Sequence, residues 1–212
     1  MKNLILIGAG DWGQEVHSWI HESIQYGVEY IFKGFIDDNV NILANSNLDS
    51  DLYLGTVNSY LPEENDVFIC TIANLKYKEK AIHKIFVKGG RFVNAFHKSV
   101  CFIGKFDIGY GVILSPFVAI SNNCKIGNHI GINLFCSIGH DVIIGDYSQL
   151  SAHCDLTGHV VLGNNVFLGS RVSIIPSVNI VSNSVLGAGA VIIRNIKIAG
   201  TYIGNPAKKL DL

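Results

Sequence analysis

The chain has 212 residues, of which 49% are hydrophobic, so it is long and apolar enough for one large domain or two small ones. The 16 Lys and Arg residues against 17 Asp and Glu residues give a formal net charge of -1. This balance excludes the basic excess that binds nucleic acids or anionic membranes, and we expect neither as a partner. The apolar segment at the N-terminus ends at Gly8 and is far too short for a membrane span or a secretory signal. We therefore expect a cytoplasmic protein.

The first 95 residues alternate between strand and helix patterns. In chain order we expect a strand over 2–7, a glycine turn over 8–13, a helix over 15–26, a strand over 30–36, a strand over 67–73, a helix over 77–87 and a strand over 91–96. This order predicts a small parallel α/β domain of the Rossmann-like kind over residues 1–95.

The glycine turn has a spacing that is typical of phosphate binding. Gly8, Gly10 and Gly13 follow a strand and open a helix, where helix N-terminal amides can hold a phosphate. Asp37, at the end of the next strand, could accept a ribose hydroxyl. The alternative is that the glycines only permit a tight turn and that Asp37 and Asp38 cap a loop.

From residue 96 onward, a period of six residues dominates the sequence. From 108 to 198 every sixth position is Ile or Leu, Phe96 and Phe102 extend the register upstream, and the position two before is small or aliphatic in most repeats. The sixteen Ile and Leu positions are Ile108, Leu114, Ile120, Ile126, Ile132, Ile138, Ile144, Leu150, Leu156, Leu162, Leu168, Ile174, Ile180, Leu186, Ile192 and Ile198. Six residues make a short strand and a corner, and three such faces close a coil of 18 residues with its apolar side chains inward. The period predicts a left-handed parallel β-helix over residues 96–212, including a C-terminal tail. A glycine often follows the apolar position, and we expect it to supply a positive φ at the corner.

The five cysteines form no Cys-x-x-Cys pair and are odd in number, which argues against disulfides or a zinc ribbon. Three histidines, His129, His153 and His159, stand three positions before an apolar position, and we expect them mid-face and pointing outward. His140 is different because it lies at a corner and is followed by Asp141, a carboxylate that can fix its tautomer and raise its basicity.

Together with the repeat, several short motifs resemble those of a known protein family. They cover residues 7–10, 34–38, 54–56, 138–141 and 203–208. With them the chain resembles bacterial sugar acetyltransferases that join an N-terminal Rossmann-like domain to a left-handed β-helix. The resemblance implies transfer of acetyl from acetyl-CoA to the amine of a nucleotide-linked amino-deoxy sugar, of the 4-amino-4,6-dideoxyhexose type, in bacterial surface-glycan biosynthesis. O-acetylation of a sialic acid or another sugar hydroxyl is the alternative. We also expect a homotrimer, because the active-site cleft of such an enzyme lies between two neighbouring β-helices.

The resemblance assigns roles to particular residues. His140 would be the general base and Asp141 its partner. The binding site for the nucleotide sugar would be lined by Gly10, Asp11, Trp12, Asp37 and Asp38. Acetyl-CoA would contact Gln149, Gly158, Ser170 and Ala188. The chain departs from the family at Trp12 and Gln149, where many members have histidine, and at Gly139, where some have Glu.

Other functions remain open at this point. Some β-helices of this kind are carbonic anhydrases with three histidine ligands, two of them five residues apart; no pair of histidines in the repeat has that spacing, so we expect no metal. A trimeric binding scaffold without catalysis is a further alternative. A Rossmann oxidoreductase is disfavoured because everything after residue 100 is repeat.

Overall fold

The computed structural model describes residues 1–44 and 46–210. The chain divides into two compact units, Met1–His97 and Lys98–Leu212. Within the described ranges, neither helix has the length and apolar character needed to cross a membrane.

The first unit is built on a parallel sheet of four strands in the order β2-β1-β3-β4. Its strands are β1 (Lys2–Ile7), β2 (Tyr30–Ile36), β3 (Asp66–Cys70) and β4 (Arg91–Phe92), its helices are α1 (Asp11–Ile20) and α2 (Leu75–Val87), and a short 3-10 helix, η1, covers Ser50–Leu52. The inner strand β1 is fully buried from Leu4 to Ile7, because it has a neighbour on each side. This apolar strand is the core of the unit.

Both helices begin earlier than the sequence predicted. Helix α1 begins directly after Gly10 and ends at Ile20, six residues before the expected end, because residues 21–29 form turns. Helix α2 begins after Asn74, whose side chain accepts a hydrogen bond from the backbone N–H of Tyr77. The expected strand over 91–96 is divided into β4 and the short β5 (Ala95–Phe96).

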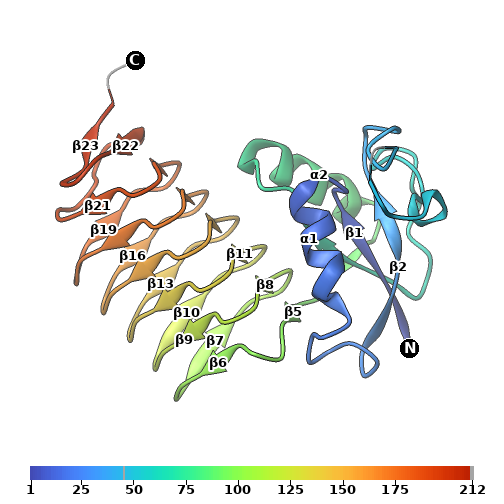
Figure 1. Cartoon of the computed structure of the whole chain (residues 1–212), viewed down its shortest axis with the longest axis horizontal. Helices are drawn as coiled ribbons and strands as arrows, with labels where there is room; N and C mark the ends of the chain where they lie inside the picture. Colours follow the sequence, from blue (N-terminus) through green and yellow to red (C-terminus); the bar gives the residue numbers. More distant parts are fainter. Residues whose placement is uncertain (45, 211–212) are drawn as a thin grey trace. The chain divides into compact units, whose positions relative to one another are not determined.

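The second unit is a left-handed parallel β-helix of about six turns (Figure 1). One face carries β6 (Cys101–Phe102), β9 (Ala119–Ile120), β12 (Ser137–Ile138), β15 (Asp155–Leu156), β18 (Ser173–Ile174) and β21 (Val191–Ile192). The second carries β7 (Phe106–Ile108), β10 (Cys124–Ile126), β13 (Ile143–Ile144), β16 (Val161–Leu162) and β19 (Asn179–Ile180). The third carries β8 (Ile113–Leu114), β11 (Gly131–Ile132), β14 (Gln149–Leu150), β17 (Phe167–Leu168), β20 (Val185–Leu186), β22 (Thr201–Ile203) and β23 (Lys208–Lys209).

The six-residue period corresponds to the core of the β-helix. Each apolar position from Leu114 to Ile192 is at most 3% exposed, so these side chains form one continuous buried column. The register fails at its last position, since Ile198 is 65% exposed while Ile196 is buried and bridges Ile180. The last coil is therefore two residues shorter than the period predicts.

The corners are made differently from our expectation. The glycines that follow the apolar positions do not have positive φ; instead, the positive φ falls three residues after each apolar position from Leu114 to Ile180, on Phe117, Asn123, His129, Phe135, Asp141, Tyr147, His153, His159, Asn165, Arg171, Ser177 and Asn183. The glycines are needed for space: a Cβ on Gly127 would lie 2.3 Å from the carboxylate oxygen of Asp146 on the next coil. The expectation of glycine at positive φ was therefore wrong, because coil stacking rather than backbone conformation selects glycine there.

Candidate active site

His140 and Asp141 form a hydrogen-bonded pair at an outward corner between β12 and β13. The imidazole Nδ1 of His140 lies 2.8 Å from Oδ2 of Asp141, and the two side chains are 58% and 34% exposed. Asp141 is the corner residue with φ 60°, and its backbone N–H donates to the carbonyl of Asn122 on the preceding coil. The stacking of the coils thus fixes the backbone that carries the pair.

The carboxylate of Asp141 is held in its charged form. The side-chain amide of Asn123 donates to Oδ1 of Asp141 at 2.5 Å. The hydrogen bonds from Asn123 and then from His140 lower the pKa of Asp141 below its ordinary value. Because an ionised carboxylate only accepts, Nδ1 of His140 carries the proton and Nε2 keeps a free lone pair. This is the tautomer that a general base needs.

Gly158, on the next coil, lies against the imidazole ring. A Cβ on Gly158 would lie 2.6 Å from both Cε1 and Nε2 of His140. Gly158 is buried and belongs to the same edge of the β-helix as His140, one coil further on. Its lack of a side chain leaves the space that the ring occupies, a role the sequence did not indicate.

The three histidines that we expected mid-face lie at corners instead. His159 lies 3.9 Å from Asp141, measured between Nδ1 and Oδ2, and its ring meets that of His140 edge-on with centroids 5.0 Å apart. His153 is exposed and stacks on Phe135, whereas His129 is only 3% exposed. The outward placement was therefore wrong for His129, which packs against Tyr110 and Tyr147.

His140, Asp141 and His159 also form a group that could hold a metal ion. One ligand atom from each lies within 4.8 Å of the others. The expectation of no metal rested on the spacing of the histidines along the chain, which does not reveal residues that stacking brings together. A coil of 18 residues brings residue 159 beside residue 141, so the spacing of one full turn was the signal that could have found it.

The residues predicted to contact acetyl-CoA lie on more than one edge of the β-helix. Gly158 shares the corner edge of His140, while Ser170 and Ala188 are exposed at the corners that follow β17 and β20. Gln149 lies in β14 and is 3% exposed. One β-helix therefore brings Gly158 to His140 but does not bring Ser170, Ala188 or Gln149 to the same edge.

In the first unit, the three glycines of the motif have different roles: Gly8 and Gly10 lie in the turn between β1 and α1, and Gly13 lies in the first turn of α1. Gly8 has φ 104°, and a Cβ on Gly13 would lie 2.2 Å from the carbonyl oxygen of Gly8, so both are needed for the turn itself. Gly10 precedes α1 with φ −68°, and a Cβ there would meet nothing within 4 Å. The protein gives no internal reason for glycine at position 10, and this side of the turn is open.

Asp37 supports this turn directly. Its Oδ2 accepts from the backbone N–H of Ala9 at 2.9 Å, and its Oδ1 accepts from that of Asn39 at 2.8 Å. The hydroxyl of Tyr53 donates to its backbone carbonyl. Both carboxylate oxygens therefore already accept hydrogen bonds that shape the loop. This agrees with the alternative in which Asp37 caps a loop.

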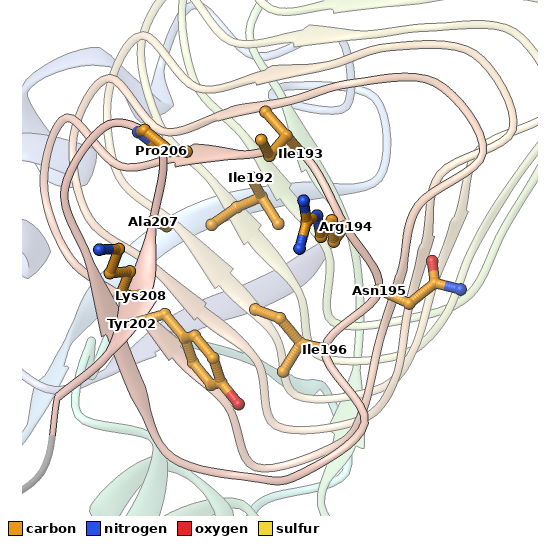
Figure 2. A pocket seen from close by; sticks show the side chains of 9 residues that line it. All are labelled: Ile192, Ile193, Arg194, Asn195, Ile196, Tyr202, Pro206, Ala207 and Lys208. Carbon is orange, nitrogen blue, oxygen red and sulfur yellow. The ribbon is translucent and has the colours of Figure 1, made fainter.

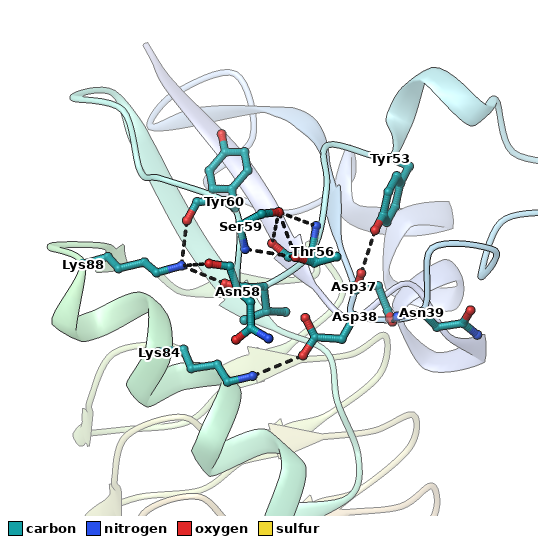
Figure 3. A network of polar contacts seen from close by, with 11 residues as sticks. Asp37, Asp38, Asn39, Tyr53, Thr56, Asn58, Ser59, Tyr60, Lys84 and Lys88 are labelled. Carbon is teal, nitrogen blue, oxygen red and sulfur yellow. Dashed lines mark hydrogen bonds and ion pairs between the residues drawn. The ribbon is translucent and has the colours of Figure 1, made fainter.

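A cavity of about 430 Å³ lies beside this loop, lined by Asp37, Asp38, Val57, Ile72, Tyr77, Lys80, Ala81 and Lys84. Lys84 pairs with Asp38 at 3.2 Å (Figure 3). Lys80 and Lys84 were not predicted from the sequence; they are spaced i, i+4 on α2, which puts them on one helix face.

Two other predicted residues of the first unit do not line this cavity. Asp11 is exposed as the first residue of α1, where its negative charge suits the helix dipole. Trp12 is half-buried, and within the described residues its buried indole Nε1 has no hydrogen-bond partner.

A second cavity, of about 270 Å³, lies at the C-terminal end of the β-helix (Figure 2). The last coil, β22 and the segment leading into β23 line it, with Tyr202, Arg194 and Lys208 as its larger side chains. None of the predicted site residues lies among its lining residues.

The chain is similar in sequence to a known protein over part of its length and similar in fold to solved structures over its whole length. No protein-family model matches. A GDP-perosamine N-acetyltransferase of Escherichia coli O157:H7 is 30% identical over 133 residues, which is 61% of this chain and 58% of that protein. The aligned part is thus less than two thirds of that relative. PerB from Caulobacter crescentus, solved with CoA and GDP-perosamine, is 25% identical with a TM-score of 0.87 over 100% of this chain and 98% of its own. WeeI from Acinetobacter baumannii AYE is 23% identical with a TM-score of 0.84 over 99% and 100%.

The whole chain shares its fold with PerB and WeeI. The relatives of this chain include sugar N-acetyltransferases.

Proposed function

We propose that the chain is an acetyl-CoA-dependent N-acetyltransferase that acts on the amino group of a nucleotide-linked amino-deoxy sugar, of the 4-amino-4,6-dideoxyhexose type. The observation that carries the proposal is the hydrogen-bonded pair of His140 and Asp141 at an exposed corner of the β-helix, with Nε2 of the imidazole free to accept a proton.

The chemistry follows from this pair. The sugar amine attacks the thioester carbonyl of acetyl-CoA, and Nε2 of His140 removes a proton from the amine as the C–N bond forms. The C–S bond then breaks, and the imidazolium returns the proton to the CoA thiolate. Asp141 stabilises the imidazolium in the interval. No acyl-enzyme is needed, and much of the rate comes from holding both substrates together.

The acceptor would be bound by the first unit, acting as a Rossmann-like nucleotide-sugar domain. Lys80 lines the cavity of about 430 Å³ and would pair with a diphosphate, as would Lys84 once it leaves Asp38. The open side of Gly10 leaves space for a phosphate next to the N-terminus of α1. One relative is named for GDP-perosamine, and another was solved with it. A GDP-linked amino sugar is therefore the first acceptor to test.

We further propose that the enzyme is a homotrimer in the cytoplasm. Ser170 and Ala188 are on a different edge of the β-helix from His140 and Gly158. A neighbouring β-helix packed against the His140 edge would bring both sets to one cleft and provide a surface along which acetyl-CoA can lie.

The test is the release of CoA thiol from acetyl-CoA, measured with a thiol reagent, in the presence of GDP-perosamine and of the UDP- and dTDP-linked 4-amino-4,6-dideoxy sugars. The proposal predicts acceptor-dependent release with at least one of them, and mass spectrometry should show a single acetyl group on the sugar nitrogen. Release only with a sialic acid or another acceptor that lacks an amine would contradict N-acetylation. No release with any acceptor would contradict the activity itself.

A further inference from the structure

The corner that carries His140 holds a second histidine that the proposed reaction does not use. His159 stands one coil above Asp141, and its Nδ1 is 3.9 Å from the carboxylate oxygen that accepts from His140. One ligand atom of each residue lies within 4.8 Å of the others. Zinc ligands at 2.0–2.2 Å from the ion are typically about 3–3.6 Å apart, so small side-chain rotations would complete a site.

The backbone that presents these three side chains is fixed by the fold. Asp141 and His159 are consecutive corner residues with φ 60° and 62°, and the N–H of His159 donates to the carbonyl of His140 at 2.9 Å. Both imidazoles are more than half exposed, which leaves room for water in the remaining coordination positions.

We propose that this corner binds one divalent transition-metal ion, with Zn²⁺ as the reference case, through Nδ1 of His140, a carboxylate oxygen of Asp141 and Nδ1 of His159. Two imidazoles and one carboxylate suit Zn²⁺, whereas Mg²⁺ prefers oxygen ligands alone. The carboxylate also neutralises part of the charge of the ion.

Metal binding and base catalysis exclude each other at this corner. When a metal occupies Nδ1 of His140, the ring proton must reside on Nε2, and Nε2 then has no lone pair to accept a proton from a substrate. Bound Zn²⁺ therefore inhibits acetyl transfer, and a chelator restores it. This consequence rests on the proposed function, whereas the metal site itself does not.

The binding test is calorimetric titration of ZnCl₂ into the full chain carrying Cys101→Ser, which removes an exposed thiol that could also bind zinc. We expect one tight site per chain that MgCl₂ does not compete for. In the same background, His159→Asn keeps a residue that tolerates positive φ but removes a ligand. Since loss of an outer-shell partner alone weakens metal affinity about 10–100-fold, the zinc Kd should rise at least about tenfold.

His153→Asn is the matched control, because His153 is another exposed corner histidine with φ 61° outside this group. It should bind zinc as the parent does. The absence of a tight site in the parent, or equal affinity in the parent and in His159→Asn, would overturn the proposal.

An activity assay distinguishes the metal-site proposal from the acetyltransferase proposal. Initial rates of acetyl transfer, each normalised to the same protein without zinc, should fall with ZnCl₂ and recover with EDTA, and His159→Asn should require at least about tenfold more zinc for the same inhibition. Acetyl transfer that zinc does not inhibit, in a chain that does not bind zinc at this corner, would overturn the metal proposal and leave the enzyme proposal intact. Zinc binding at this corner without inhibition would instead contradict the role of His140 as the base. Zinc binding by a chain that transfers no acetyl group would support the metal site and contradict the enzyme.

Discussion

In the β-helix, each coil repeats the packing of the coil before it, whereas in the first unit every strand and helix has its own set of neighbours. The apolar column from Leu114 to Ile192 occupies one inward position per face. The corners between the faces carry residues as different as Phe117, Asn123 and His159 in the same backbone conformation. The repeat therefore fixes the column and leaves the corners free to vary.

Fold and proposed chemistry depend on different residues in the β-helix but share residues in the first unit. His140 is exposed, Asp141 is partly exposed, and neighbouring coils hold their backbone in place. In the first unit, Asp37 both lines the cavity and accepts hydrogen bonds from the turn after β1. Substitutions should thus divide cleanly into structural and functional ones in the β-helix and should mix the two effects in the first unit.

The largest structural effect should come from the column. Ile144→Ala removes a side chain that is 1% exposed, and we expect the free energy of unfolding to fall by about 2–5 kcal/mol. Its neighbour Ile143, on the same strand, is 41% exposed, and Ile143→Ala should cost less than about 1 kcal/mol. Denaturant unfolding of both variants measures the contrast. Equal losses would show that the inward and outward positions are not distinct.

Gly158→Ala should reduce activity with little change in stability. The added methyl group would lie 2.6 Å from the ring atoms of His140, so the exposed ring must move. We expect kcat/KM to fall by up to about 100-fold, as for other displaced catalytic groups, with the thermal midpoint nearly unchanged. An increase in the KM for acetyl-CoA at constant kcat would instead assign Gly158 to donor binding, as the resemblance implied.

In the glycine turn, two similar substitutions should act differently. Gly13→Ala forces a methyl group against the carbonyl of Gly8 and should destabilise the fold by about 1–3 kcal/mol. Gly10→Ala meets no atom within 4 Å and should leave stability within about 0.5 kcal/mol, while weakening the binding of a GDP-linked sugar. Thermal unfolding and calorimetric binding test the pair. Equal stability losses would remove the assignment of Gly10 to an open ligand-facing side.

The smallest effect should come from Asn123→Gly, which keeps the corner conformation and removes the hydrogen bond to Asp141. Loss of one exposed, charge-assisted hydrogen bond should lower kcat/KM by about tenfold. Asn183→Gly is the control, since Asn183 has the same φ at another corner. A similar loss of activity in both variants would mean that the corner glycine, and not the missing amide, is responsible.

Much of the β-helix could be predicted because each coil imposes the same requirement on the sequence. The period of six placed the column correctly up to Ile192 and failed at Ile198, where the last coil is shorter. His140 and Asp141 could be singled out from their position at a corner. The closeness of His159 to Asp141 was not predicted, because it depends on the stacking of two coils that are 18 residues apart in the sequence. The lysines of the cavity were missed because only the packing of α2 shows which helix face meets the loop of Asp37.

The proposed reaction requires that the imidazole of His140 removes the proton from the acceptor. The most direct measurement compares kcat/KM for acetyl transfer in the wild type and in His140→Asn, with the thermal midpoint and CoA affinity recorded for both. We expect a loss of about 10²–10⁴-fold with fold and CoA binding retained, because the side chain is exposed. A variant that keeps its rate within threefold of the wild type would contradict the account.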